Sequence, residues 1–264
     1  MAHHFFLPGR INPGEPAVLE GENAHHALRV LRLKEGETIT LADSSGQGYL
    51  AEVAACRGDR VIAAIKSARA DPEPGVKVTL YQGWPKGDKL DLIIEKCTEL
   101  GVARIVVLAT ERSVPRPGQQ ACEQRRQRWQ QKARAAACQS RRHRIPVVEG
   151  PLELTCALAA HPAGSLLLVP WEEEPARNLQ VLFTRTLTEP SPAIATPFPS
   201  SAPTTGVPEL ALLIGPEGGL SAAEIDLARR HGGLTITLGP RILRTETAAL
   251  ACLAAMMYAL EELG

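Results

Sequence analysis

Residues 209–219 have the sequence ELALLIGPEGG, in which an apolar run ends abruptly in a turn of glycine and proline. A nearly continuous apolar run is typical of a β-strand that is buried on both faces of a parallel sheet. Glycine after such a strand lets the backbone approach a ligand closely at the carboxyl end of the sheet. The next residues, Ser221–Glu224, have the spacing of a capping box, so we expect a helix to begin there. An ordinary strand-to-helix connection would account for this loop equally well.

A second loop of the same kind occurs at residues 238–248, LGPRILRTETA, which lead from the strand candidate Leu234–Leu238 into a helix. We expect Thr245 to be the N-cap of that helix and Glu246 to lie in its first turn, where the helix dipole favours an anion. Arg244 would be costly to bury without a partner, so it is expected to face solvent or a ligand. Neither loop has the spacing of a P-loop or of GxGxxG. Two glycine loops at neighbouring strand ends indicate one shared ligand crevice.

The rest of the chain divides into two parts of different pattern. Residues 1–70 carry short apolar runs separated by turn signals, with one helical segment at Ala24–Leu33, which predicts a small β-barrel. Residues 71–75, DPEPG, discourage regular structure and are interpreted as a linker. From residue 76 to 264, strand and helix patterns alternate, which predicts an α/β domain with a mainly parallel sheet. Residues 184–208 are rich in Pro, Ser and Thr and are expected to be a flexible surface insertion.

The expected elements follow from two hydrophobic periodicities. Apolar residues that alternate or run together indicate strands, and apolar residues spaced by three and four indicate helices. The remaining strand candidates are 17–19, 38–42, 49–55, 61–65, 76–82, 102–109, 145–148 and 165–170, and the remaining helix candidates are 88–100, 119–140, 152–160 and 245–263.

Composition and charge narrow the class of protein. The chain of 264 residues contains 29 Lys and Arg against 29 Asp and Glu, so attraction of nucleic acid must come from local patches. The six cysteines form no CxxC pair and have no clustered His partners, which argues against a metal site and favours free thiols in a reducing compartment. No apolar run approaches the roughly 18 residues of a membrane span. The N-terminus also lacks the apolar core of a signal peptide, so we expect a cytoplasmic protein without membrane contact.

The blocks IGPEGGLSxxEI and LGxRILRxETA resemble the C-terminal signature of the bacterial 16S ribosomal RNA uracil-N3 methyltransferases, members of the SPOUT superfamily. The resemblance implies a PUA-like N-terminal RNA-binding barrel followed by a SPOUT α/β domain with a deep trefoil knot. Family members usually begin with basic residues before an aromatic pair, whereas this chain has His3-His4-Phe5-Phe6. The match covers nearly the whole chain apart from the Pro-rich insertion, in further blocks at Glu22–Arg32, Lys86–Lys89, Glu95–Gly101, Glu111–Ser113, Arg128–Trp129 and Gln139–Arg142.

The same resemblance implies S-adenosyl-L-methionine (SAM) as cofactor, held in a bent conformation by the knotted loops, and a homodimer that packs through the knot region. The final helix, apolar on nearly every face, suits either such an interface or burial within one subunit. The cofactor-binding residues that the resemblance implies are Ile214, Gly215, Pro216, Glu217, Gly218, Gly219, Leu238, Gly239, Ile242, Leu243 and Thr245.

The implied reaction transfers the SAM methyl group to N3 of a uridine, a nitrogen that carries a proton. We expect Arg112, Arg142 and Arg244 to stabilise the deprotonated uracil and Glu99 or Glu217 to act as the base. Glu99 could equally be a helix-surface carboxylate, and Glu217 could merely shape its loop. Alignment of the methyl group with N3 would then supply much of the rate without a dedicated base.

Contacts to RNA are expected from local basic residues. Residues 125–144 carry eight Arg and Lys and no carboxylate, although a solvated helix face has the same composition. A spacing of three or four places two arginines near two histidines on one face of the helix in the N-terminal part. The predicted RNA-binding residues are Arg10, His25, His26, Arg29, Arg32, Lys86, Lys89 and Gln139.

The leading hypothesis is therefore a SAM-dependent uracil-N3 methyltransferase that acts on 16S ribosomal RNA or on the small ribosomal subunit. One alternative is a SPOUT enzyme that modifies another RNA position, such as a ribose 2′-oxygen. A second alternative is a non-catalytic RNA-binding protein that retains the fold as a scaffold. The two intact glycine loops argue against this second alternative.

Overall fold

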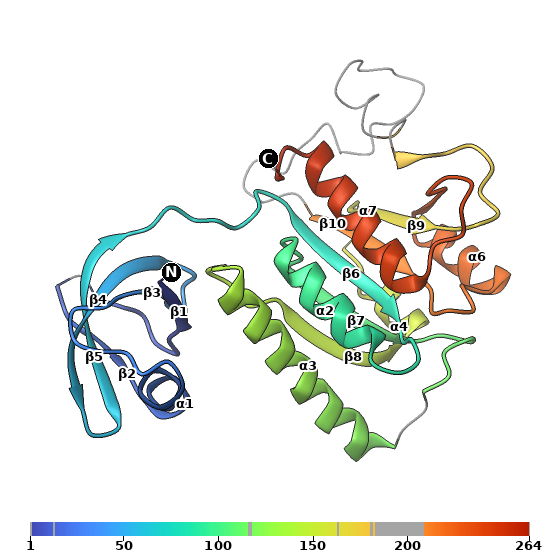
Figure 1. The fold of residues 1–264 in the computed structure, drawn as a ribbon. Coiled ribbons are helices and arrows are strands. Elements are labelled where there is room, and N and C mark those ends of the chain that lie inside the picture. Colours follow the sequence, from blue (N-terminus) through green and yellow to red (C-terminus); the bar gives the residue numbers. More distant parts are fainter. Residues whose placement is uncertain are drawn as a thin grey trace. The chain divides into compact units, whose positions relative to one another are not determined.

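The computed structural model describes residues 2–12, 14–115, 118–162, 164–179, 182 and 209–263. It divides into two compact units (Figure 1): the first contains Met1–Glu73 and Arg134–Ile145, and the second contains Pro74–Ala133 and Pro146–Gly264. The insertion expected at residues 184–208 lies outside the described residues. No helix in the described ranges is both long enough and apolar enough to cross a membrane.

The first unit is built on a five-stranded sheet with the order β1-β3-β4-β5-β2. β1 pairs with β3 in parallel, and the other pairs are antiparallel. A short helix, α1, continues directly into a π-helical turn, η1, so the helical segment begins at Gly21 rather than at Ala24. Apolar side chains of the sheet and of this segment form one buried cluster. The elements are β1 (His3–Phe6), β2 (Ala17–Leu19), α1 (Gly21–His25), η1 (His26–Val30), β3 (Thr38–Ala42), β4 (Gly48–Arg57) and β5 (Arg60–Ala68).

The segment Arg134–Ile145 belongs to the first unit, which the sequence-based division after residue 75 did not anticipate. Ala137 lies near the end of the long helix α3 (Gln119–Gln139) and packs in a buried cluster with Phe6 and Ala42. Apolar burial therefore holds the end of this helix against the sheet. A charged contact adds to this packing, because Arg142 binds Glu73 with its Nη2 2.5 Å from Oε2. The first unit is thus formed by two stretches of the chain.

The second unit contains a six-stranded parallel sheet with the order β11-β9-β10-β6-β7-β8, which confirms the predicted α/β class. The strands are β6 (Lys77–Gly83), β7 (Arg104–Ala109), β8 (Val147–Glu153), β9 (Leu166–Pro170), β10 (Glu209–Ile214) and β11 (Gly233–Ile236). One expectation is wrong: β10 and β11 are not neighbours, because β9 lies between them.

Helices cover both faces of this sheet. Figure 1 shows α2 and α7 side by side on one face, and the two helices contact each other. α4 and α6 pack against the sheet in a second buried cluster, which includes Leu158, Ile225 and Tyr81. The helices are α2 (Lys89–Glu99), α3 (Gln119–Gln139), α4 (Leu154–Ala159), α6 (Ala222–Arg230) and α7 (Thr245–Ala259).

Candidate functional site

The loops that follow β9, β10 and β11 surround adjoining cavities at the carboxyl edge of the parallel sheet. One cavity, of about 320 Å³, is lined by 214–220 and 242–245 together with Glu172. The other, of about 480 Å³, is lined by 237–243 and shares Glu172 with the first. The loops after β10 and β11 therefore do border one crevice, although their strands are separated by β9. The loop after β9, which contributes Glu172, was missed because the sequence offered no glycine signal there.

The backbone after β10 is tight enough to require glycine. A Cβ atom on Gly215 would lie 2.8 Å from the carbonyl carbon of Gly219, closer than real side chains approach. Gly219 itself has a φ of +70°, a conformation that costs other residues steric energy. Gly83 at the end of β6 lies so close to Pro216 that its own Cβ would be 2.6 Å from Pro216 Cδ. The turn is thus held against the end of β6.

A buried polar network joins the two predicted loops. Thr245 donates from Oγ1 to the carbonyl oxygen of Gly215 at 2.6 Å, and Gln82 donates from Nε2 to Thr245 Oγ1 at 2.9 Å. Gln82 is fully buried, and its Oε1 has no hydrogen-bond partner among the described residues. The sequence signal for Gln82 was present, since a polar side chain at the end of a buried strand must find partners. We did not single it out from the sequence.

The prediction that Thr245 is the N-cap of the last helix is wrong. Arg244 occupies that position, with φ −66° and ψ 154°, and its side chain makes no capping hydrogen bond. The Thr245 hydroxyl points to Gly215 instead, so a tertiary contact has replaced the local one. The capping box at Ser221 is confirmed, because Ser221 and Glu224 exchange both expected hydrogen bonds.

Glu217 is held by lysines. Its carboxylate accepts from Lys89 Nζ at 2.7 Å and from the backbone N–H of Lys86 at 3.0 Å. Burial acts to raise the pKa of Glu217, but the hydrogen bond from Lys89 and those from backbone N–H groups outweigh it, so the pKa lies below its ordinary value. A carboxylate with a lowered pKa is a weak base, and this geometry favours the loop-shaping role.

Arg112 reaches the crevice loop directly. Its Nη1 donates to the carbonyl oxygen of Gly218 at 2.7 Å. A Cβ atom on Gly218 would lie 3.1 Å from the Cβ atom of Arg112. Arg244 is exposed and lines the 320 Å³ cavity. Leu243 is half-buried at the same wall, whereas Ile242 is 91% exposed. The structure therefore brings two of the predicted arginines to the edge of the crevice.

Of the other two predicted catalytic residues, Glu99 is not brought there, and Arg142 belongs to the first unit. Glu99 is the last residue of α2, an exposed carboxylate 2.8 Å from Lys96 Nζ. The first residue of that helix, Lys89, touches Glu217, and ten residues of helix separate Glu99 from that end by about 15 Å. Arg142 is buried in the first unit, where its guanidinium binds Glu73 through Nε and Nη2. Its planar fork is already taken by a carboxylate.

The predicted RNA-facing residues of the N-terminal part are all exposed, and they lie in the first unit. Four of them lie on α1, on η1 or directly after η1, and the fifth, Arg10, lies between β1 and β2. Gln139, at the end of α3, is exposed in the same unit. Among the described residues no cluster of three or more His, Cys, Asp or Glu side chains could hold a metal ion. The exposed set consists of Arg10, His25, His26, Arg29 and Arg32.

Known families match both parts of the chain. Residues 72–257 match a family described as an RNA methyltransferase domain, and residues 19–66 match one described as an RNA methyltransferase PUA domain. The chain is 33% identical over 244 residues to the ribosomal RNA small subunit methyltransferase E of Bacillus subtilis, covering 92% of this chain and 90% of the relative. It is 30% identical over 258 residues to the protein of the same name from Mycobacterium tuberculosis, covering 96% and 90%.

Solved structures agree over nearly the full length. A ribosomal RNA small subunit methyltransferase E from Neisseria gonorrhoeae, bound to S-adenosyl methionine, superposes with a TM-score of 0.80 at 28% identity and 98% coverage of both chains. A putative methyltransferase from Legionella pneumophila, in complex with SAM, superposes with a TM-score of 0.79 at 28% identity and the same coverage.

Proposed function

Because the chain belongs to the ribosomal RNA small subunit methyltransferase E family, we propose that it transfers the methyl group of SAM to N3 of a uridine in 16S ribosomal RNA. The observation that carries the proposal is the crevice between the loops after β10 and β11, at the carboxyl edge of the parallel sheet. Ligands of open α/β sheets bind at this edge.

The crevice residues fit SAM. Gly215 and Gly219 leave backbone exposed at the cavity wall, and a side chain on Gly219 would approach Glu172 Oε1 at 3.2 Å. The predicted cofactor residues from 214–219 and 242–245 line one cavity, and Leu238 and Gly239 line the adjoining one. Together they would hold the cofactor, which supplies an electrophilic methyl group on a sulfonium sulfur.

The chain's own residues would prepare the uridine. N3 would first lose its proton to solvent, and the resulting anion would then accept the methyl group that the bound cofactor supplies. Arg112, fixed by Gly218, and the exposed Arg244 place positive charge where the deprotonated uracil develops negative charge. The lowered pKa of Glu217 and the position of Glu99 disfavour both of these carboxylates as the base. Stabilisation of charge and alignment of the two reacting atoms would therefore supply the rate.

The ribosomal RNA would be held through phosphate contacts. The exposed residues Arg29 and Arg32, with His25 and His26 beside them, form a local basic face on a chain without net charge. Lys86 and Lys89 stand next to Glu217 at the crevice loop, where they would meet RNA near the acceptor uridine. A protein that acts on this substrate would work in the cytoplasm.

A homodimer is part of the proposal. The helix α7 is largely apolar, and near its C-terminal end the side chain of Tyr258 is 74% exposed. Ile242, which lies just before the N-terminal end of α7, is 91% exposed. Ala251 and Ala255 are exposed on the same face of α7 as Tyr258, and a second copy of the chain could cover this apolar stripe. Light scattering should give twice the mass of the chain, and Tyr258→Arg should shift the protein toward monomer. A monomeric wild-type protein would refute this part of the proposal.

The activity is tested with calorimetry and nucleoside mapping. The wild-type protein should bind SAM, and small-subunit RNA from cells that lack the gene should gain N3-methyluridine when treated with the protein and SAM. Arg112→Gln should lower the rate at saturating SAM about 10²–10³-fold and leave SAM affinity unchanged, as removal of a transition-state donor does. A methylated ribose oxygen in place of N3-methyluridine would point to a different acceptor atom. Failure to bind SAM would reject the enzyme.

A further inference from the structure

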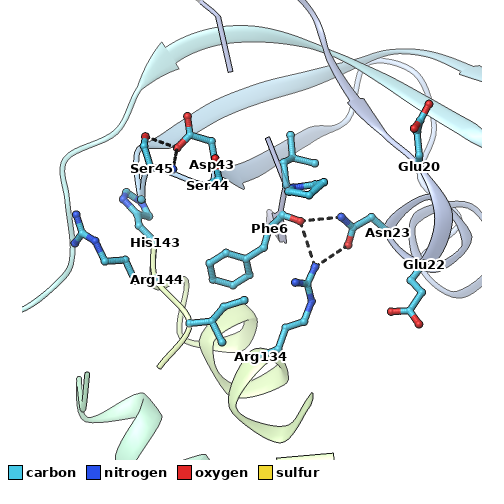
Figure 2. A pocket seen from close by; sticks show the side chains of 14 residues that line it. Phe6, Glu20, Glu22, Asn23, Asp43, Ser44, Ser45, Arg134, His143 and Arg144 are labelled. Carbon is cyan, nitrogen blue, oxygen red and sulfur yellow. Dashed lines mark hydrogen bonds between the residues drawn. The ribbon is translucent and has the colours of Figure 1, made fainter. Parts of the chain in front are cut away.

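The first unit contains a cavity of about 590 Å³ (Figure 2). Its lining includes none of the residues that have been given a role in cofactor binding, methyl transfer or RNA binding so far. It is bordered by β1, by the turn after β3, by the start of α1 and by the 134–145 segment. Its volume is in the range of small-ligand sites, about 300–1,000 Å³. Its apolar wall is formed by Phe6, Leu7, Pro8 and Ile145.

A fixed guanidinium stands on this wall. The Arg134 guanidinium carbon lies 5.7 Å from the centroid of the Phe6 ring. Arg134 Nη2 donates to the carbonyl oxygen of Phe6 at 3.2 Å and to Asn23 Oδ1 at 3.3 Å, while Asn23 Nδ2 donates to the same carbonyl at 2.8 Å (Figure 2). Both hydrogen bonds that Arg134 makes to described residues start at Nη2. Nε and Nη1 therefore keep their N–H donors for a ligand, in an orientation that is already set.

A second cation lies at the rim. Arg144 is exposed and donates from Nη1 to Asp71 Oδ2 at 2.9 Å. Its guanidinium lies against Gly46, where a Cβ atom would be 2.7 Å from Arg144 Nε. The glycine thus leaves room for the arginine beside the cavity. A guanidinium that is half open to solvent suits a phosphate group.

The cavity also has one carboxylate that no other described residue engages. Asp43 accepts hydrogen bonds from Ser45 and from neighbouring backbone N–H groups, and Glu20 pairs with Arg60 at 3.0 Å. Glu22 has no hydrogen bond or ion pair from its side chain to any described residue. A carboxylate in such a place accepts from the exocyclic amino group of a nucleobase.

His143 is a buried polar residue of the cavity wall, with Nδ1 3.7 Å from Asp71 Oδ1. It is 2% exposed and lines the cavity, and neither ring nitrogen has a hydrogen-bond partner among the described residues. Burial lowers the pKa of His143, so the neutral ring offers one donor and one acceptor. Both ring nitrogens are buried within the protein, and the ring stacks on His4, so His143 shapes the cavity wall and does not itself bind the nucleotide.

We infer that this cavity binds one unpaired nucleotide of the RNA substrate, with a base that carries an exocyclic amino group beside Glu22 and Arg134 and a phosphate at Arg144. The inference rests on the proposed action of the chain on RNA. Uracil has no amino group, so this nucleotide is distinct from the uridine that is methylated. The exposed His25, His26 and Arg29 follow Asn23 along α1 and η1 and would hold the adjoining phosphates.

The test compares labelled single-stranded oligomers of cytidine, adenosine and uridine, with binding to the full chain followed by fluorescence anisotropy at one salt concentration. Wild-type protein should bind the cytidine or the adenosine oligomer about tenfold more tightly than the uridine oligomer. This is the difference in affinity that one well-formed hydrogen-bonded contact to a base provides. Glu22→Met should remove this preference. Asp59→Asn, which removes the same charge from an exposed turn, should keep it.

Arg144→Gln provides a second variant, with Arg57→Gln as its control at an exposed position outside the cavity. Arg144→Gln should weaken binding of all three oligomers, and by more than the control does. The inference is overturned if wild-type protein binds the three oligomers equally, or if each cavity variant behaves like its control. Failure of the proposed function differs from both outcomes, because it would appear as wild-type protein that transfers no methyl group to small-subunit RNA.

Discussion

Replacement of Thr245 by valine tests the network that joins the two crevice loops. Valine keeps the shape of the side chain but removes the donor to Gly215, at 2.6 Å, and the acceptor for Gln82, at 2.9 Å. Thr245 is 5% exposed and Gln82 is fully buried, so water cannot replace either bond. Gln82 keeps its hydrogen bond to the carbonyl oxygen of Gly83.

The expected loss of stability is about 1–3 kcal/mol, the cost of a lost buried hydrogen bond together with partly unsatisfied polar groups. In a chain of this size each kcal/mol lowers Tm by about 2–4 °C. SAM affinity should fall about tenfold if about 1.4 kcal/mol of that cost comes from loosening of the loops that hold the cofactor. The loss of affinity should exceed any loss of RNA binding, because the network lies beneath the cofactor loops.

Calorimetry with SAM and a thermal unfolding scan measure the two effects. Thr247→Val is the matched control, since Thr247 is exposed on the first turns of the same helix. The double variant Thr245→Val with Gln82→Met should lose less than the sum of the two single losses, because both residues share one hydrogen bond. Wild-type SAM affinity and Tm in Thr245→Val would refute the assigned role of the network.

Three further perturbations test other features of the structure. Gly215→Ala should abolish SAM binding, because its Cβ would lie 2.8 Å from backbone. Gly218→Ala should cost less, because its Cβ would meet the Arg112 side chain at 3.1 Å, a wider approach than the one at Gly215. Equal losses of affinity in calorimetry would contradict this order. The double variant Arg29→Ala with Arg32→Ala should bind RNA more weakly, and its RNA affinity should depend less on salt, while its affinity for SAM stays unchanged. If a salt titration shows unchanged RNA affinity, this face does not bind RNA. Burial is the largest cause that lowers the pKa of His4 from 6.5 to about 4, so the unfolded chain takes up a proton before the folded one as the pH falls. The free energy of unfolding should therefore drop by about 3 kcal/mol as the pH falls from 6.5 to 4. Urea titrations should show a smaller drop for His4→Gln than for the wild-type protein. If both proteins show the same pH dependence, His4 is not the source of the drop.

Most elements were predictable from the sequence, and the missed strand β1 depends on a contact between residues far apart in the chain. β10 carries an uninterrupted apolar run, and the capping box at Ser221 is a four-residue pattern, so both follow from neighbouring residues. β1 was missed because its sequence, HHFF, places His4 in the interior, where Nδ1 pairs with Thr40 Oγ1 at 2.9 Å. A partner 36 residues away cannot be recognised from local pattern. The trefoil knot that the family resemblance implies stays a prediction.

The site was less predictable than the fold, for the same reason. The glycine loops were found because glycine marks backbone that needs space, as Gly215 shows. Arg142 looked available because a sequence does not show that Glu73 binds its guanidinium. Glu99 looked available because helix length alone does not show which end of α2 meets the loops. Charged residues find partners across the fold, so composition predicts that they are present but not what they bind.

The sequence by itself determined the parallel α/β domain, the separate N-terminal part and the two glycine loops, because hydrophobic periodicity and backbone sterics act between residues close in the chain. Only the tertiary structure decided that β9 lies between the two loop-bearing strands and that Thr245 binds Gly215 rather than capping its own helix. It also decided that the 134–145 segment completes the first unit. These outcomes depend on which buried polar and apolar groups meet across long separations, and that competition is settled only when the chain packs.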